Sequence, residues 1–339
     1  MAPLQYTHET LPAPGRAVAV APGVRWLRMP LPFALDHVNL WLIRDGAEAW
    51  ATVDTGIGLD PVKEAWRGVL GEHRLSRQIV THFHPDHVGL AAWLEQETGA
   101  PLWMTQGEYA TAQLVKNQIA GYSIGAMTAF FRRHGLDAER VAAIDKRGNA
   151  YGRGVPELPA TFRRMFEGEE FAIGEHRWRV IPGFGHSAEH ASLYCAELRV
   201  LVSGDMLLPR ISTNVSAFAA APEADPLGSY LASIDRYQAL PEDTLVLPSH
   251  GKPFRGLHER IEQLHVHHDE RCRVLLDACA GTPRSAADLL PALFERDITD
   301  PHQTMFAMGE SIAHLIYLEQ MRAMTRVLDD ATIRFVTAH

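Results

Sequence analysis

The stretch His82-Phe83-His84-Pro85-Asp86-His87 decides the fold of this chain. Its first two histidines stand two residues apart after an apolar strand-like run, so both imidazoles can point to one side of an extended backbone. The proline then turns the chain, and the aspartate and the third histidine begin a helix. Two imidazoles can hold one cation while the carboxylate and the third imidazole address a neighbouring cation. Because imidazole and carboxylate are ordinary zinc ligands, the stretch predicts a metal site.

Three later segments also place a ligand-type side chain in the loop that follows an expected strand. His186 lies in Gly185-His186-Ser187, Asp205 ends Ser203-Gly204-Asp205, and His250 lies in Pro248-Ser249-His250-Gly251. Functional side chains gather at strand ends in layered folds. We therefore expect His186, Asp205 and His250 to complete the ligand set.

Strand and helix patterns alternate through much of the chain, which predicts an α/β layered body. The expected strands cover residues 18–29, 37–43, 50–54, 78–81, 170–173, 177–181, 191–195, 200–202 and 244–247. Between the two β-rich halves the pattern becomes helical, as an insertion at about residues 106–165 would be. We expect one catalytic domain over residues 1–256 that contains this insertion.

The tail, residues 257–339, has a different pattern. It predicts three helices, over 257–280, 285–294 and 304–324, stopped or separated by glycine and proline. Two short strands, 326–328 and 332–336, flank Asp329-Asp330 like a hairpin. Three helices and a hairpin resemble a winged helix, so we expect a second, winged-helix-like α domain.

The histidine motif together with His186, Asp205 and His250 resembles the metallo-β-lactamase superfamily over about residues 15–255, in its glyoxalase II or lactamase-like branch. The resemblance implies an αββα sandwich with the site along one sheet edge. It implies that Asp54, at the end of an early strand, supports the metal loop. The tail, through residues 253–257, 267–268 and 309–315, resembles the extension of the lactamase-like endoribonuclease and thioesterase branches.

The resemblance also implies a role for each ligand. His82, His84 and His186 would bind the first metal. Asp86, His87 and His250 would bind the second, and Asp205 would bridge both. Two zinc ions, with iron or manganese as alternatives, would share a hydroxide that Asp86 orients.

The implied activity is hydrolysis of a small carbonyl ester, above all a thioester of the acyl-coenzyme A or glutathione type. A metal-dependent endoribonuclease or phosphodiesterase of the same fold is the main alternative. A mononuclear iron persulfide dioxygenase is another, and the complete second ligand set argues against it. A winged-helix binding protein with a decayed hydrolase body is disfavoured by the intact ligand set, since each unpaired buried ligand would be costly to retain.

The distribution of charged residues along the chain indicates which kinds of partner it can bind. The chain has a formal net charge of −9, and Glu259 to His339 holds eight arginines, no lysine and thirteen acidic residues. Binding of nucleic acid needs clustered basic residues, so this charge balance disfavours nucleic acid as a partner. By contrast, Gln106 to Met165 holds nine basic and five acidic residues. That stretch is either a solvated face or a rim, including Arg132 and Arg133, that attracts an anionic small-molecule substrate.

The remaining signals leave alternatives open. His190, four residues after His186, either orients a ligand or a substrate, or only begins the next strand. The three cysteines predict no disulfide framework, and neither a signal-peptide pattern nor a membrane-length apolar run is evident. We expect a cytoplasmic protein without a membrane partner, and a homo-oligomer is left open.

Overall fold

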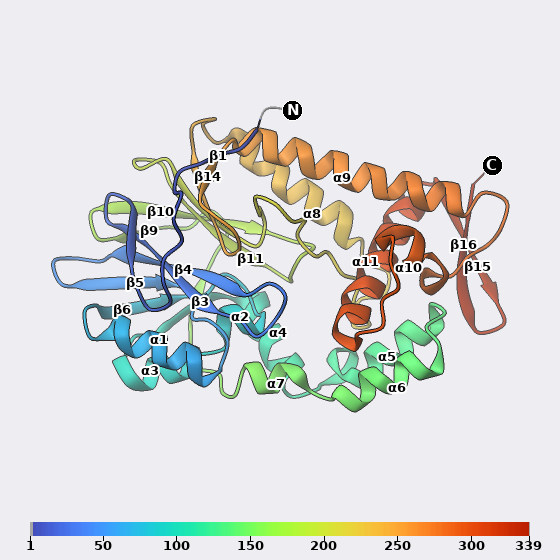
Figure 1. Cartoon of the computed structure of the whole chain (residues 1–339), viewed down its shortest axis with the longest axis horizontal. Coiled ribbons are helices and arrows are strands. Elements are labelled where there is room, and N and C mark those ends of the chain that lie inside the picture. The colour runs from blue at the N-terminus through green and yellow to red at the C-terminus, as the bar shows by residue number, and fades with distance from the viewer. Residues whose placement is uncertain (1–2, 339) are drawn as a thin grey trace. The chain divides into compact units, whose positions relative to one another are not determined.

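The computed structural model describes residues 3–338 and contains two seven-stranded mixed sheets (Figure 1). One sheet has the order β2-β3-β4-β5-β6-β7-β8, with bounds Val18–Ala21, Val24–Pro30, His37–Arg44, Ala49–Val53, Arg74–Ile79, Leu102–Thr105 and Arg163–Met165. The other has the order β1-β14-β13-β12-β11-β10-β9, with bounds Gln5–Tyr6, Phe254–Arg255, Leu245–Pro248, Val200–Gly204, His190–Cys195, His176–Gly183 and Glu170–Ile173. Parallel pairs run from β5 to β8 and between β12 and β13, and the other neighbours are antiparallel.

The main core lies between these sheets. Trp26 and Trp41 from one sheet and Trp178 and Leu193 from the other are buried in one apolar cluster. The Trp26 and Trp41 rings stack with centroids 6.2 Å apart. At about 25 cal/mol per Å², burying one indole stabilises the fold by on the order of 5 kcal/mol. This core fixes the two sheets against each other.

Helices cover the outer face of the first sheet. In α1 (Asp60–Leu70), Val62 and Trp66 are four residues apart and share a buried face, as the helical period requires. They pack with Leu94 of α3 (Ala91–Thr98) in a second apolar cluster that includes Leu27 and Leu40. On the second sheet, Tyr237 of the 3₁₀ turn η2 (Arg236–Ala239) shares a 2.7 Å hydrogen bond with Ser192 of β11. The αββα layering expected from the sequence is confirmed.

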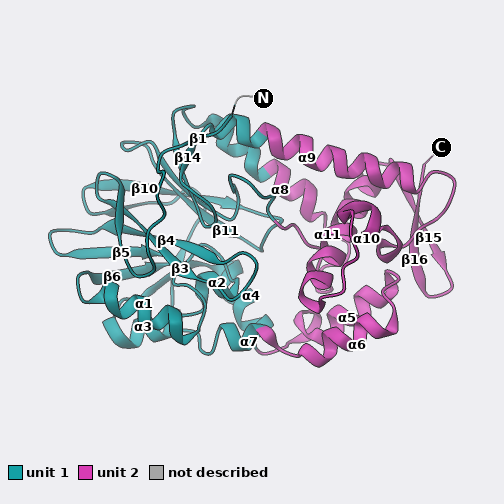
Figure 2. Cartoon of the chain, viewed as in Figure 1, with its two compact units in different colours: residues 1–116, 151–213, 233–261 teal, residues 117–150, 214–232, 262–339 magenta. Residues whose placement is uncertain are grey.

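Figure 2 divides the chain into two compact units. Unit 1 comprises residues 1–116, 151–213 and 233–261, and unit 2 comprises 117–150, 214–232 and 262–339. In unit 2, α5 (Ile124–Arg133) and α6 (Ala138–Arg147) lie with helices of the tail, and the His134 carbonyl accepts a hydrogen bond from Ala287 N at 3.1 Å. The helical insertion is thus split, and its middle belongs to the same unit as the tail. The expected division into domains over residues 1–256 and 257–339 stays a prediction.

The tail forms the three expected helices and the hairpin. These elements are α9 (Leu257–Ala278), α10 (Ala286–Phe294), α11 (Pro301–Gln320), β15 (Met324–Asp329) and β16 (Thr332–Thr337). Ser285 caps α10 in a reciprocal box with Asp288, which explains where that helix begins. The likeness of this arrangement to a winged helix stays a prediction. Within residues 3–338, no helix combines the length and the apolar character that crossing a membrane requires.

Candidate metal centre

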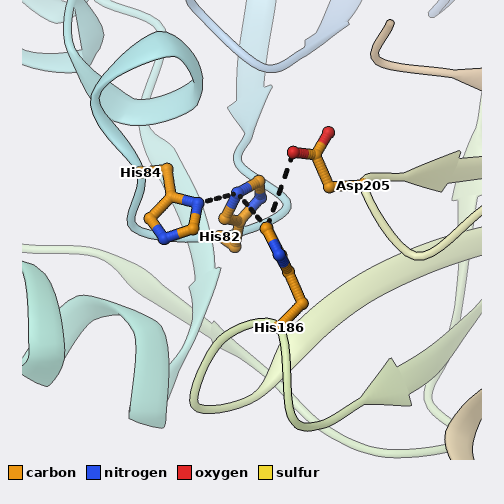
Figure 3. A group of neighbouring side chains, drawn as sticks. All are labelled: His82, His84, His186 and Asp205. Atoms are coloured by element: carbon orange, nitrogen blue, oxygen red, sulfur yellow. Dashed lines mark hydrogen bonds and ion pairs between the residues drawn. The ribbon is translucent and has the colours of Figure 1, made fainter. Parts of the chain in front are cut away.

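Four side chains from three loops of unit 1 converge in the first ligand group (Figure 3). His82 Nε2 lies 2.9 Å from His84 Nδ1 and 3.1 Å from His186 Nε2. Asp205 Oδ2 lies 3.5 Å from His186 Nε2. Imidazole nitrogens that face one another so closely need a proton or a cation between them. The chain therefore brings together the expected first set with atoms suitable for one metal ion.

The second group consists of Asp86, His87 and His250. Asp86 Oδ2 lies 3.5 Å from His87 Nε2 and 3.4 Å from His250 Nε2. Asp205 reaches this group with its other oxygen, since Oδ1 lies 3.6 Å from Nε2 of both histidines. One carboxylate thus addresses both groups, the arrangement expected of a bridging ligand. All seven side chains predicted as ligands are assembled.

Loop geometry explains how these residues meet. β6 ends at Ile79, and α2 (Pro85–Val88) begins at the proline of the motif, so His82 and His84 lie on the extended connection. Asp205 follows β12, whose last residue, Gly204, has a φ of 55°. A side chain at Gly204 would place its Cβ 2.2 Å from His190 Nε2. Only glycine allows this approach.

The second ring nitrogen of three ligands is fixed by a neighbour. His87 Nδ1 donates to Asp54 Oδ2 at 2.8 Å, and His250 Nδ1 donates to the His37 carbonyl at 2.8 Å. Thr81 Oγ1 donates to Asp54 and accepts from His82 Nδ1 at 3.0 Å. In the neutral form of each ring, Nε2 is therefore the nitrogen that carries the lone pair, and it faces the ligand group. This is how supporting hydrogen bonds orient metal-binding histidines.

Two buried atoms test whether a metal fits. Of the side-chain atoms in residues 3–338, His87 Nε2 and Asp205 Oδ1 are among those that are buried without a hydrogen-bond partner. Buried polar atoms are nearly always paired, because leaving one unpaired costs about 1–3 kcal/mol. Both atoms point into the ligand groups, where a cation would satisfy them. The residues present therefore fit two metal ions.

The charges of the second group also favour a cation. Burial opposes charge on His250, but the Asp205 and Asp86 carboxylates raise its pKa to about 10. Burial likewise opposes charge on His87, and the same carboxylates with Asp54 raise its pKa well above the ordinary value. In the first group, burial and the neighbouring His186 lower the pKa of His84 to about 3. That imidazole is neutral at pH 7 and has a lone pair to give.

The structure also gives the contacts of Asp54 and His190, the two residues expected to support the ligands. Asp54 has a φ of 65°, in the left-handed region, and its buried carboxylate joins Thr81 to His87. His190 Nε2 accepts a hydrogen bond from Asp205 N at 3.2 Å. This contact joins His190 to the backbone of a ligand-group residue, and its role in orienting a ligand stays a prediction. His190 also begins β11, as the alternative had it.

Arg132 and Arg133 end α5 and are exposed. They belong to unit 2, whereas all seven ligand-group residues belong to unit 1. Their proposed part in substrate attraction stays a prediction.

Sequence reasoning missed two residues that hold the ligand loops. Asn39 Nδ2 donates to the carbonyls of Pro248 and Gly251, at 2.8 Å each, on either side of His250. Glu108 accepts hydrogen bonds from the loops of His82 and His186. Asn39 lies within a strand and Glu108 within a helix, so neither carries a local signal. The position of Glu108 just beyond the end of β7 was the one available hint.

Comparison with known proteins supports this description. The family model of the metallo-beta-lactamase superfamily matches residues 34–250, and that of the metallo-beta-lactamase-like C-terminal domain matches residues 272–338. This chain is similar to a beta-lactamase domain protein from Burkholderia ambifaria whose crystal structure is known, with 46% sequence identity and a TM-score of 0.91. The match covers 99% of this chain and 98% of the Burkholderia chain.

Two relatives are described by activity. A protein of Bacillus subtilis strain 168, "Probable metallo-hydrolase YqjP", is 24% identical over 329 residues, 92% of this chain and 97% of the relative. The hydroxyacylglutathione hydrolase of Pseudomonas aeruginosa strain LESB58 is 43% identical over 68 residues, 20% of this chain and 26% of that enzyme.

Proposed function

The chain belongs to the metallo-β-lactamase superfamily and is a metal-dependent hydrolase, and from this premise we propose that its substrate is a small carbonyl ester, above all a thioester of the acyl-coenzyme A or glutathione type. The observation that carries the hydrolytic chemistry is the position of Asp205 between two complete ligand groups. The partial similarity to hydroxyacylglutathione hydrolase supports the thioester, because hydroxyacylglutathione is one.

The donor set suits zinc, with iron or manganese as alternatives, because it consists of imidazoles and carboxylates without a thiolate. Two such ions, when bound, would lower the pKa of a water molecule and polarise the ester carbonyl. We propose two Zn²⁺ ions as the resident metals. His82, His84 and His186 would hold one and Asp86, His87 and His250 the other, with Asp205 shared.

The chain's own contribution centres on Asp86. Its side chain is 21% exposed, compared with 10% for Asp205, so it is the more accessible carboxylate of the two groups. A carboxylate there accepts a hydrogen bond from the attacking water and orients it. The water oxygen bonds to the carbonyl carbon, the C–S bond breaks, and the water proton ends on the departing sulfur. The products are a carboxylic acid and a thiol.

The alternatives differ in what they require. A persulfide dioxygenase would use one iron. The second ligand group, which consists of Asp86, His87 and His250, would then have no role. A nuclease would need a basic nucleic-acid surface, and the tail is acidic.

One experiment tests the proposal. The purified protein, with its metal content quantified, is assayed against acyl-coenzyme A, glutathione thioester, lactone, phosphodiester and β-lactam panels. Thioester hydrolysis that is abolished by chelation and restored by Zn²⁺ supports the proposal. Preference for a phosphodiester, or no hydrolysis of any thioester by the metal-loaded protein, overturns it.

A further inference from the structure

We propose that Glu108 is a positioning residue that clamps together the two loops of the first ligand group and thereby sets the metal affinity of that group. The inference rests on the proposed dinuclear centre but not on the identity of the substrate.

Glu108 is fully buried in unit 1, at the beginning of α4 (Gln106–Lys116). Its Oε2 accepts a 2.8 Å hydrogen bond from the backbone N–H of Phe83, the residue between His82 and His84. Its Oε1 accepts from Ser187 Oγ at 2.7 Å and from Glu189 N at 2.5 Å. One carboxylate therefore joins the loop of the first two ligands to the loop of the third.

The corner between β7 and α4 strengthens this connection. Thr105 Oγ1 donates to the Glu189 carbonyl at 2.8 Å, and Gly107 N donates to Glu189 Oε2 at 2.7 Å. A Cβ on Gly107 would lie 2.9 Å from Glu189 Cβ, so the two segments meet as closely as glycine permits. Tyr151 Oη holds the other side of the first loop by donating to the Phe83 carbonyl at 2.6 Å.

The chemistry of the site demands a carboxylate. Three donors converge on Glu108, and an ionised carboxylate has two acceptor oxygens and no donor. Glutamine has the same shape, but its amide nitrogen is a donor only. Whichever way the amide is oriented, at least one of the three donors would face another donor. The Glu108→Gln variant should therefore loosen one of the two loops without changing the volume of the core.

The second group offers a matched comparison. The loop of His250 is held by Asn39, whose amide donates to the carbonyls of Pro248 and Gly251. Replacing that amide by a carboxylate in Asn39→Asp would place an acceptor against two acceptors. The clamp predicts opposite selectivity: Glu108→Gln weakens the first group, and Asn39→Asp weakens the second.

The test measures metal binding, not turnover. A His250→Ala background reports the first group and a His84→Ala background the second, each titrated with Zn²⁺ against a chromogenic chelator. Glu108→Gln should lower affinity by about 10–100-fold in the first background and leave it unchanged in the second. Asn39→Asp should show the reverse. Ser187→Ala, which removes one donor of three, is the milder variant and should weaken the first group less.

The outcomes are distinct. Equal losses in both backgrounds would show that Glu108 only stabilises the fold, and unchanged affinity in both would show that it has no role; either overturns the clamp. A wild type that binds no Zn²⁺ overturns the clamp and the proposed function together. A selective loss in a protein that hydrolyses no thioester supports the clamp and overturns only the substrate.

Discussion

Asp54 Oδ2 accepts a hydrogen bond from His87 Nδ1 at 2.8 Å, and neither side chain has more than 1% of its surface exposed. The bond leaves His87 Nε2 as the atom that faces the second ligand group. Asp54→Asn should reverse this, because an amide N–H in place of Oδ2 favours the tautomer with its proton on Nε2. We expect the Zn²⁺ affinity of the second group to fall by about 10–100-fold.

Chelator competition measures that fall, and ¹⁵N chemical shifts of the His87 ring report the tautomer. Asp45→Asn is the matched control, since Asp45 is also largely buried but accepts from Ser76, Arg77 and Gly174 instead of a ligand. The control should lose some stability and keep its metal affinity. A Zn²⁺ affinity for Asp54→Asn equal to that of the wild type would show that the tautomer is set by some other contact.

Metal content follows from the ligand groups. The protein should bind about two ions per chain, because seven ligands are too many for one tetrahedral site. His250→Ala should empty the second site preferentially, whereas Asp205→Asn should weaken both, since that carboxylate addresses both. Elemental analysis after reconstitution gives the stoichiometry. At most one ion in the wild type would refute the dinuclear assignment.

Asp86 has the clearest catalytic prediction. Asp86→Asn keeps the size of the side chain but removes the negative charge that orients water, so kcat should fall by at least about 100-fold at saturating Zn²⁺. Thermal unfolding should stay close to that of the wild type. Asp60→Asn, at an exposed carboxylate in α1, is the control that should retain full activity. An unchanged kcat for Asp86→Asn would remove Asp86 from the mechanism.

The sequence predicted the ligand set because its members follow strands or sit in one short motif. His82 and His84 need only an extended connection. Asp205 directly follows β12, and His250 comes two residues after its parallel neighbour β13. Parallel neighbours bring their carboxyl ends to the same sheet edge, so strand order alone brings those ligands together. The tail helices were predictable for a similar reason, since glycine and proline mark their ends.

The sequence did not reveal contacts between residues that lie far apart along the chain and belong to no recognisable local pattern. Glu108 meets Glu189 across 81 positions, and Asn39 meets Pro248 across 209. An acidic residue in a helix ordinarily faces solvent, so nothing local distinguishes Glu108. The grouping of α5 and α6 with the tail depends equally on tertiary packing, such as the hydrogen bond from Ala287 to His134.

A buried histidine pair in unit 2 predicts a pH dependence of stability. His268 Nδ1 and His314 Nε2 share a 3.0 Å hydrogen bond, and His314 Nδ1 donates to the Glu310 carbonyl. Burial, aided by the neighbouring His314, lowers the pKa of His268 to about 2; burial lowers that of His314 to about 4. In the unfolded chain both titrate near pH 6.5, so the unfolded state binds more protons below that value. The contribution of this pair to the free energy of unfolding is therefore fully present above about pH 6.5, and it is lost as the pH drops toward the folded pKa values.

The variant His268→Gln isolates this effect, because Gln can still donate to His314 Nε2. Each such histidine contributes a slope of about 1.4 kcal/mol per pH unit well below pH 6.5. Burial raises the pKa of Glu310 to about 7, so protonation of Glu310 stabilises the folded protein as the pH falls below that value. This opposes the effect of the histidines. The informative quantity is therefore the difference in unfolding free energy between the wild type and the variant. Urea unfolding between pH 6 and 5 should show a shallower loss for the variant. Parallel curves would mean that His268 is protonated in the folded protein.

The exposed pair Arg132 and Arg133 gives the last prediction, on the substrate. If α5 attracts an anionic leaving group, Arg132→Glu with Arg133→Glu should raise KM for acyl-coenzyme A on the order of 10-fold at low salt. The kcat should stay near normal, because contacts remote from the reacting bond bind substrate and transition state equally. The KM penalty should shrink with added salt, since exposed charges are screened beyond about 10 Å at 0.1 M ionic strength. A short neutral thioester serves as the control substrate and should be indifferent to both substitutions. Equal KM values for the two proteins at low salt would leave the arginines as part of a solvated helix face, and the substrate's charge would then have to be recognised elsewhere.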